Sequence, residues 1–73
     1  MKSIKFSKPK IIYEVVGKSS NGDWETIDYY KTLNAAQERA KRVEKQNKYP
    51  TIDINLIIDD DLVETYDIDG NPR

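Results

Sequence analysis

The sequence predicts a single α+β domain in which a four-stranded antiparallel sheet carries one helix on one face. Three observations predict it: four stretches rich in β-branched and aromatic residues, one stretch of helical period between the second and third of them, and no repeat or linker. A chain of 73 residues has room for one domain only, because domains this small bury about 60% of the surface that their unfolded chains expose. We therefore predict one domain over residues 1–73, with residues 1–9 as a flexible or covering arm.

The first two predicted strands form a hairpin. The stretch KIIYEVV, residues 10–16, has strand composition and ends at Gly17. Asn21-Gly22 is a strong turn signal, and WETIDYYK follows it as the second strand. Residues 10–31 are therefore predicted to form a hairpin with a loop of several residues.

The predicted helix covers TLNAAQERAKRVEKQNK, residues 32–48. Thr32 or Asn34 supplies the N-cap oxygen. The residues that recur at helical spacing on one face are Leu33, Ala36, Ala40, Val43 and Asn47. Because this stripe is narrow and its residues are small, we expect the helix to lie close against the sheet.

The third predicted strand is TIDINLII, residues 51–58, which begins after Pro50. The fourth is DLVETYDI, residues 61–68, and the turn residues Gly70-Asn71-Pro72 follow it. We predict that these strands give the sheet the order second, first, third and fourth strand. If Asp59, Asp60 and Asp61 form the loop, the core-side pairs are Ile58 with Leu62, Ile54 with Tyr66 and Ile52 with Ile68, while Leu56 faces Glu64.

The same register places acidic residues on the other side of this hairpin. It predicts Asp53 opposite Asp67, Asn55 opposite Thr65, Ile57 opposite Val63, and Asp69 beside Thr51. Like charges that face each other destabilise a sheet, and neither Asp53 nor Asp67 is needed for a turn in this register. We expect a lysine of the first hairpin, a bound cation or a basic partner surface to compensate their charge. Alternatively, the two aspartates form an acidic edge that resists aggregation.

An apolar patch is predicted on the face of the sheet that the helix leaves uncovered. Placing Glu14 outward puts Ile11, Tyr13, Val15, Ile27 and Tyr29 in the core. It puts Ile12, Val16, Trp24, Tyr30, Ile57 and Val63 on the helix-free face. Such a patch is typical of an interaction surface, unless the amino-terminal MKSIKFSKP folds back and covers it.

Charge is divided unevenly along the chain. Residues 1–48 hold eleven Lys and Arg against six Asp and Glu, a net charge of +5, whereas residues 49–73 hold Arg73 against seven acids, a net charge of −6. This division favours self-association or a polar binding surface, although it also fits neutralisation within one small domain.

The side chains argue against catalysis, cofactors and metals. The chain has no histidine and no cysteine, so the commonest acid, base and thiol groups are missing, and a cytoplasmic setting is the simplest interpretation. No secretion signal is recognised. In DIDGNPR, Asp67, Asp69 and Asn71 are spaced like the start of a calcium loop, but glycine stands at the fourth position where that loop needs it at the sixth. A plain turn is predicted there.

The segments DWETIDYYKTLNAAQERA and IIDDDLVETYDIDGN resemble many small bacterial and phage proteins of unknown function. The resemblance covers residues 23–71. Its features are Trp24, Tyr30, Thr32, Ala36, Ala40 and Asp69-Gly70. Small size and an acidic end also resemble phage-encoded inhibitors of host defence, including anti-CRISPR proteins, which implies a partner such as a nuclease complex.

We predict a non-catalytic protein-binding module that uses an acidic, aromatic sheet face against a basic partner surface. The predicted partner-binding residues are Trp24, Tyr30, Ile57, Val63, Asp53, Asp67 and Asp69. A homodimer formed through the same face is the structural alternative. A single-stranded nucleic-acid binder is the third, because Trp24, Tyr30 and Tyr13 could stack on bases, but the nearby carboxylates would repel phosphates.

Overall fold

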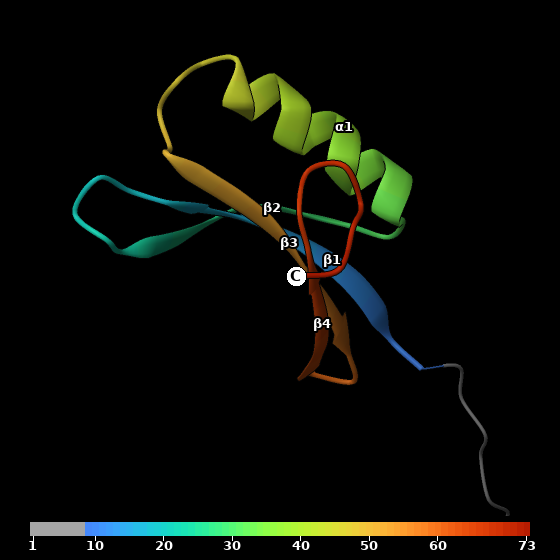
Figure 1. Ribbon diagram of the computed structural model, residues 1–73. Coiled ribbons are helices and arrows are strands. Elements are labelled where there is room, and N and C mark those ends of the chain that lie inside the picture. The colour runs from blue at the N-terminus through green and yellow to red at the C-terminus, as the bar shows by residue number, and fades with distance from the viewer. Residues whose placement is uncertain (1–8) are drawn as a thin grey trace, which may run out of the picture.

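The fold is a four-stranded antiparallel sheet with one helix laid across one face (Figure 1). The computed structural model describes residues 9–73. Its elements are β1 (Ile11–Lys18), β2 (Trp24–Tyr30), α1 (Leu33–Glu44), β3 (Thr51–Ile58) and β4 (Asp61–Tyr66). The strand order is β2-β1-β3-β4. The predicted fold class and sheet order are therefore confirmed, while residues 1–8 of the predicted arm lie outside the described residues.

Helix α1 begins at the predicted cap and ends earlier than predicted. The backbone of Thr32 is extended, and its hydroxyl oxygen accepts a hydrogen bond from the Ala35 N–H at 3.2 Å. At the other end the chain leaves the helix after Glu44, and Asn47 adopts a φ of 54°. Asn47 is exposed and takes no part in the buried stripe, because the left-handed backbone turns the chain toward β3.

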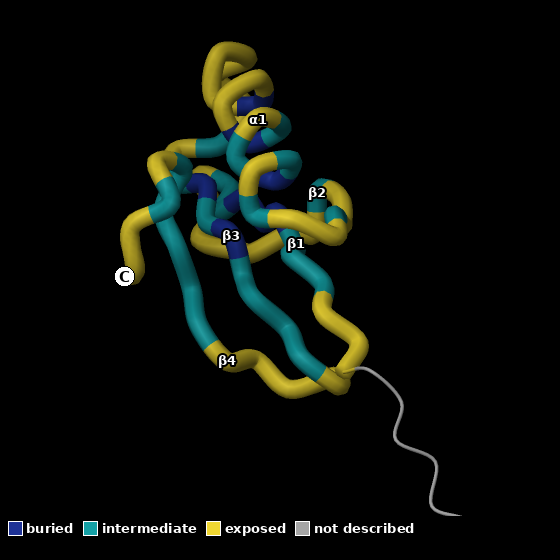
Figure 2. The backbone as a smooth tube through the Cα atoms, turned by 90° about the vertical axis from the view of Figure 1, so that its right-hand side faces the viewer, coloured by how far each residue is buried: buried dark blue, intermediate teal, exposed yellow. Residues whose placement is uncertain are grey.

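The core lies between α1 and one half of the sheet. Its fully or nearly fully buried members are Val15, Ala36, Ala40, Val43, Ile52 and Ile54. The two alanines let the helix backbone approach the strands, as the narrow stripe predicts. In Figure 2 the buried segments gather beneath α1, while the other half of β1, β3 and β4 extends past the helix. Ile11, predicted in the core, lies in this uncovered half and is 45% exposed.

A β-bulge in β2 reverses the predicted sides of two tyrosines. Val15 pairs with Asp28 and Val16 pairs with Thr26, so Ile27 is an extra residue that interrupts the alternation. Tyr30 consequently packs against the core, and Tyr29 is 56% exposed. The prediction that Tyr30 lies on the helix-free face and Tyr29 in the core is wrong.

A second bulge lies in β4 near the acidic turn. The predicted pair of Ile54 with Tyr66 is confirmed, as are Asn55 with Thr65 and Leu56 with Glu64. Beyond them Ile57 faces Leu62 and Ile58 faces Asp61, so Val63 is the extra residue. The predicted pairs of Ile58 with Leu62 and Ile57 with Val63 are wrong.

The turn between β3 and β4 explains this change of register. It consists of two residues, Asp59 and Asp60, whose φ angles are 50° and 71°. Turns with both central residues at positive φ match the twist of paired strands, so the shorter turn is favoured over the three-residue loop predicted. The Asp59 carboxylate also accepts a hydrogen bond from the Lys10 N–H at 2.9 Å, which ties the turn to the start of β1.

Candidate functional site on the helix-free face

A row of polar side chains crosses all four strands on the helix-free face. The Thr26 hydroxyl on β2 donates to Glu14 Oε2 on β1 at 2.6 Å. On β3, Asn55 Nδ2 donates to Glu14 Oε1 at 3.3 Å. The Thr65 hydroxyl on β4 donates to Asn55 Oδ1 at 2.9 Å. These three bonds fix the side chains in a continuous ladder, which we call the polar row.

Glu14 carries a negative charge that no cation compensates within residues 9–73. Both of its oxygens accept hydrogen bonds from neutral groups, and the side chain is half-buried. The ion pair found in this part of the chain joins Arg73 to Asp53 instead. The sequence predicts that Glu14 points outward, but Glu14 is not among the predicted partner-binding residues. Its place in β1, next to the predicted pair of Asn55 with Thr65, is the signal that could have assigned it to the site.

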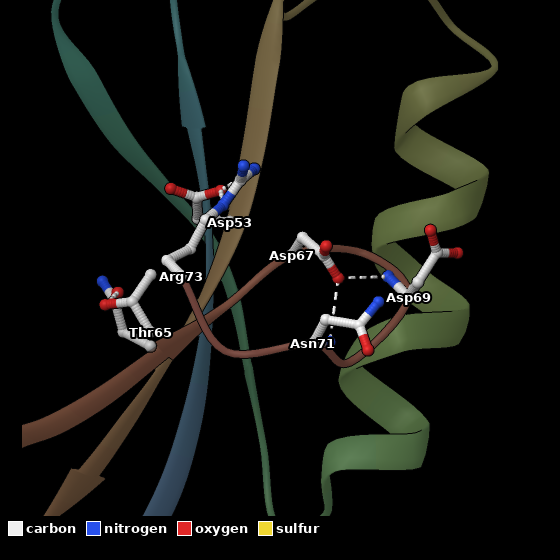
Figure 3. Close-up of polar contacts among 7 residues, drawn as sticks. Asp53, Thr65, Asp67, Asp69, Asn71 and Arg73 are labelled. Carbon is white, nitrogen blue, oxygen red and sulfur yellow. Dashed lines mark hydrogen bonds and ion pairs between the residues drawn. The ribbon is translucent and has the colours of Figure 1, made fainter.

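Asp53 is compensated by Arg73. Nε and Nη2 of Arg73 donate to Asp53 Oδ1 at 2.9 Å and 2.6 Å (Figure 3). The Arg73 N–H also donates to the Thr65 carbonyl at 2.8 Å, and Pro72 bridges to Tyr66. The residues after β4 thus fold back along that strand. They bring Arg73 to Asp53 as its compensating cation, a partner that the sequence does not predict.

Asp67 builds a turn and does not face Asp53 as a free carboxylate. Its Oδ1 accepts hydrogen bonds from the N–H groups of Asp69 and Asn71, both at 2.9 Å (Figure 3). The turn packs against α1, where Gln37 Nε2 donates to the Ile68 carbonyl at 3.4 Å. The prediction that Asp67 is not needed for a turn is therefore wrong. Asp69 is exposed on the same turn.

We expect Asp67 to make the stability of the fold pH-dependent in acid. The hydrogen bond from the Asn71 backbone, helped by that from Asp69 and by the charge of Arg73, holds the pKa of Asp67 below its ordinary 3.8 despite opposing desolvation. A lowered pKa in the folded state means that the stabilisation is complete above pH 3.8 and is lost as the pH falls through the folded value. Asp67→Asn keeps the acceptor oxygen but does not titrate. Urea unfolding should give a stability gap between the two proteins that closes in acid; a gap independent of pH would contradict this role.

The apolar side chains of the face form two groups on either side of the polar row. At one end Trp24 is 49% exposed and lies opposite Lys18, whose Nζ is 5.9 Å from the centroid of the indole ring. At the other end Ile57 lies between Ile12 and Leu62. The single continuous patch predicted is thus divided. Trp24 and Ile57 lie on the predicted face, and Val63 is exposed at the β4 bulge.

A shallow groove runs between Trp24 and the polar row. Its lining residues are Glu14, Val16, Trp24, Glu25, Thr26, Asp53, Asn55 and Thr65, and its volume is about 410 Å³. Val16 is almost fully buried, which makes it the apolar floor. We call this site the Glu14 groove. It combines an aromatic wall, an apolar floor and carboxylates.

Within residues 9–73, no group of three or more acidic side chains is arranged to hold a metal ion. In the same part of the chain, none of the helical structure has the length and hydropathy needed to cross a membrane.

Comparisons with known proteins identify no relative. No family, curated protein or solved structure matches this chain. The resemblance to small phage and bacterial proteins therefore stays a prediction, and the case for a function depends on the helix-free face.

Proposed function

We propose that the protein is a non-catalytic binding module whose helix-free sheet face docks onto a basic surface of a partner protein. The observation that carries the proposal is the Glu14 groove, which is lined both by a carboxylate that has no ion-pair partner among residues 9–73 and by a half-exposed tryptophan. Tryptophan is among the residue types that most often dominate the binding energy of an interface. A carboxylate without a cation favours partners of positive charge and rejects negative ones.

The polar row prepares this face for binding. Because Thr26, Glu14, Asn55 and Thr65 are already hydrogen-bonded to one another, few side chains have to be ordered when a partner arrives. The strands beneath them are paired on both sides in β1 and β3. Surfaces of positive charge are characteristic of proteins that grip nucleic acid, so a nuclease complex is a partner class worth testing.

The proposal predicts a partner whose capture depends on the groove. The tagged protein is used to capture partners from a native lysate, in parallel with Trp24→Ala, Glu14→Gln and, as a charge-matched control on the exposed face of α1, Glu38→Gln. A captured protein is then purified and its affinity measured by titration calorimetry. We expect Trp24→Ala to weaken binding by about 2 kcal/mol, roughly 30-fold, and Glu38→Gln to have no effect. Equal binding by all three variants would contradict the use of this face.

Self-association is the second candidate, and the apolar end of the sheet favours it. Leu62, Val63 and Tyr29 are all more than half exposed, and Ile11 is nearly so. Contiguous patches of exposed apolar groups are typical of interfaces. Light scattering on the purified protein separates the two candidates: a dimer that Leu62→Ser converts to a monomer would assign this end to self-association and leave the groove free.

A further inference from the structure

From the Glu14 groove we infer the chemistry of the group it receives: an arginine side chain of the partner, seated with its guanidinium between two carboxylates and its plane against Trp24. This inference rests on the proposed function and names the partner group for the same site. It follows from three features of the groove, taken in turn.

The first feature is the spacing of the carboxylates. Glu14 pairs with Asn55 and Val16 pairs with Asp53, so Glu14 and Asp53 are diagonal neighbours on β1 and β3. The backbones of such neighbours lie about 7–8 Å apart, and their Cβ atoms lie somewhat closer. Among residues 9–73, each Glu14 oxygen accepts a single hydrogen bond, and Asp53 uses only Oδ1. A carboxylate accepts up to about four hydrogen bonds, so both groups retain acceptor capacity toward the groove.

The second feature is Arg73, which is an internal example of the proposed ligand. Its guanidinium already lies on this face and donates twice to Asp53. Asp53 therefore already binds one planar cation on this face. Arg73 follows β4 and is not among the residues that line the Glu14 groove, which come from all four strands.

The third feature is the aromatic wall. The Lys18 Nζ lies 5.9 Å from the centroid of the Trp24 ring, a distance at which a ring face attracts a cation. Lys18 is the last residue of β1 and lies opposite Trp24, so it competes for the same ring. Removing its charge should therefore strengthen the binding of another cation.

Arginine satisfies this groove better than lysine. A guanidinium carries five donors in a plane, so it can bond to two carboxylates and stack on an indole ring at the same time. An ammonium is a compact and strongly hydrated charge with three donors, and it can satisfy only one end of the groove. The Val16 floor suits the apolar stem of the incoming side chain.

The test uses N-acetyl-arginine amide as the probe and N-acetyl-lysine amide as its matched comparison. Each is titrated into the intact 15N-labelled protein, and the shifts of the Trp24 indole N–H and the Asn55 side-chain amide are followed. We expect saturable shifts with the arginine probe and weaker ones with lysine. Glu14→Gln, which keeps the Thr26 bond, should lower the arginine affinity roughly tenfold, Lys18→Ala should raise it, and Glu38→Gln should leave it unchanged.

Two results would overturn the inference. One is the absence of saturable shifts at Trp24 and Asn55 in a protein that the spectra show to be folded. The other is equal affinity in the Glu14→Gln and Glu38→Gln proteins. Either result would leave the proposed function standing if groove-dependent capture of a partner persisted. Conversely, an arginine probe that binds as expected while no partner depends on the groove would contradict the proposed function alone.

Discussion

Replacing Ile54 with alanine is expected to remove a large share of the free energy of unfolding of the protein. Ile54 is completely buried in β3, where it pairs with Val15 on one side and Tyr66 on the other. Truncating a buried isoleucine to alanine lowers the free energy of unfolding by about 2–5 kcal/mol, because apolar contacts are lost and a cavity is left behind. At about 0.05–0.15 kcal/mol per residue, the whole chain has roughly 4–11 kcal/mol of stability. The substitution therefore removes a major share of it.

Leu62→Ala is the matched control for this experiment. It removes a side chain of the same size from β4, but Leu62 is 62% exposed. Its effect should stay near about 0.5 kcal/mol, as for other surface positions. Urea unfolding followed by far-ultraviolet circular dichroism measures both variants. Equal losses of stability would show that the core does not centre on Ile54 beneath the helix.

Gly17→Ala is expected to destabilise the sheet by overpacking. The ring of Tyr49 lies directly on Gly17, and a Cβ added there would stand 2.5 Å from Tyr49 Cγ and 2.6 Å from Cδ1. The ring cannot simply move aside, because its hydroxyl donates to Glu25 Oε2 at 2.8 Å. Overpacking of this kind costs about 1–3 kcal/mol. In a domain of this size each kcal/mol lowers the melting temperature by about 4–8 °C, which thermal unfolding detects.

A double-mutant cycle isolates the cause. If the clash with the ring produces the loss, Gly17→Ala should cost much less in a Tyr49→Ala background, where the space is empty. If the two effects simply add, strain in the β1 backbone and not the tyrosine ring would be responsible. The contact also explains why a glycine stands at position 17 of β1: a side chain there would displace Tyr49 from the sheet.

The succession of strands and helix along the chain was predictable, because the spacing of apolar side chains differs between strands and helices. Ile52 and Ile54 alternate with polar residues, and Ala36, Ala40 and Val43 recur at helical spacing. Burying both sets against each other leaves few arrangements for one helix and four strands. Thr32 could be proposed as a cap for the same local reason, since its hydroxyl needs only the backbone three residues ahead.

The two bulges were not predictable by the same method. Strict alternation assumes that every residue of a strand has one partner, whereas Ile27 and Val63 have none. Each bulge moves the residues beyond it to the other side of the sheet. Tyr30 was assigned to the wrong face for this reason. Asp59 and Asp60 did not reveal the two-residue turn either, because positive φ angles are more typical of Asn-Gly or Asp-Gly.

The candidate site was only partly visible in the sequence. An outward Glu14 and the pairing of Asn55 with Thr65 follow from parity, and Trp24 lies on the expected face. The ion pair between Arg73 and Asp53 depends on a tail that doubles back through the Asp67 turn. No periodicity extends through that turn, so the partner of Asp53 could be found only in three dimensions.

The same doubling back has a consequence for how the sheet meets other chains. β4 is a margin of the sheet, and its neighbours Pro72 and Arg73 already occupy the stretch beside Tyr66 and Thr65. Proline has no backbone N–H that could donate a hydrogen bond to an added strand. An incoming strand therefore cannot pair with this part of β4, which lowers the tendency of this edge to aggregate.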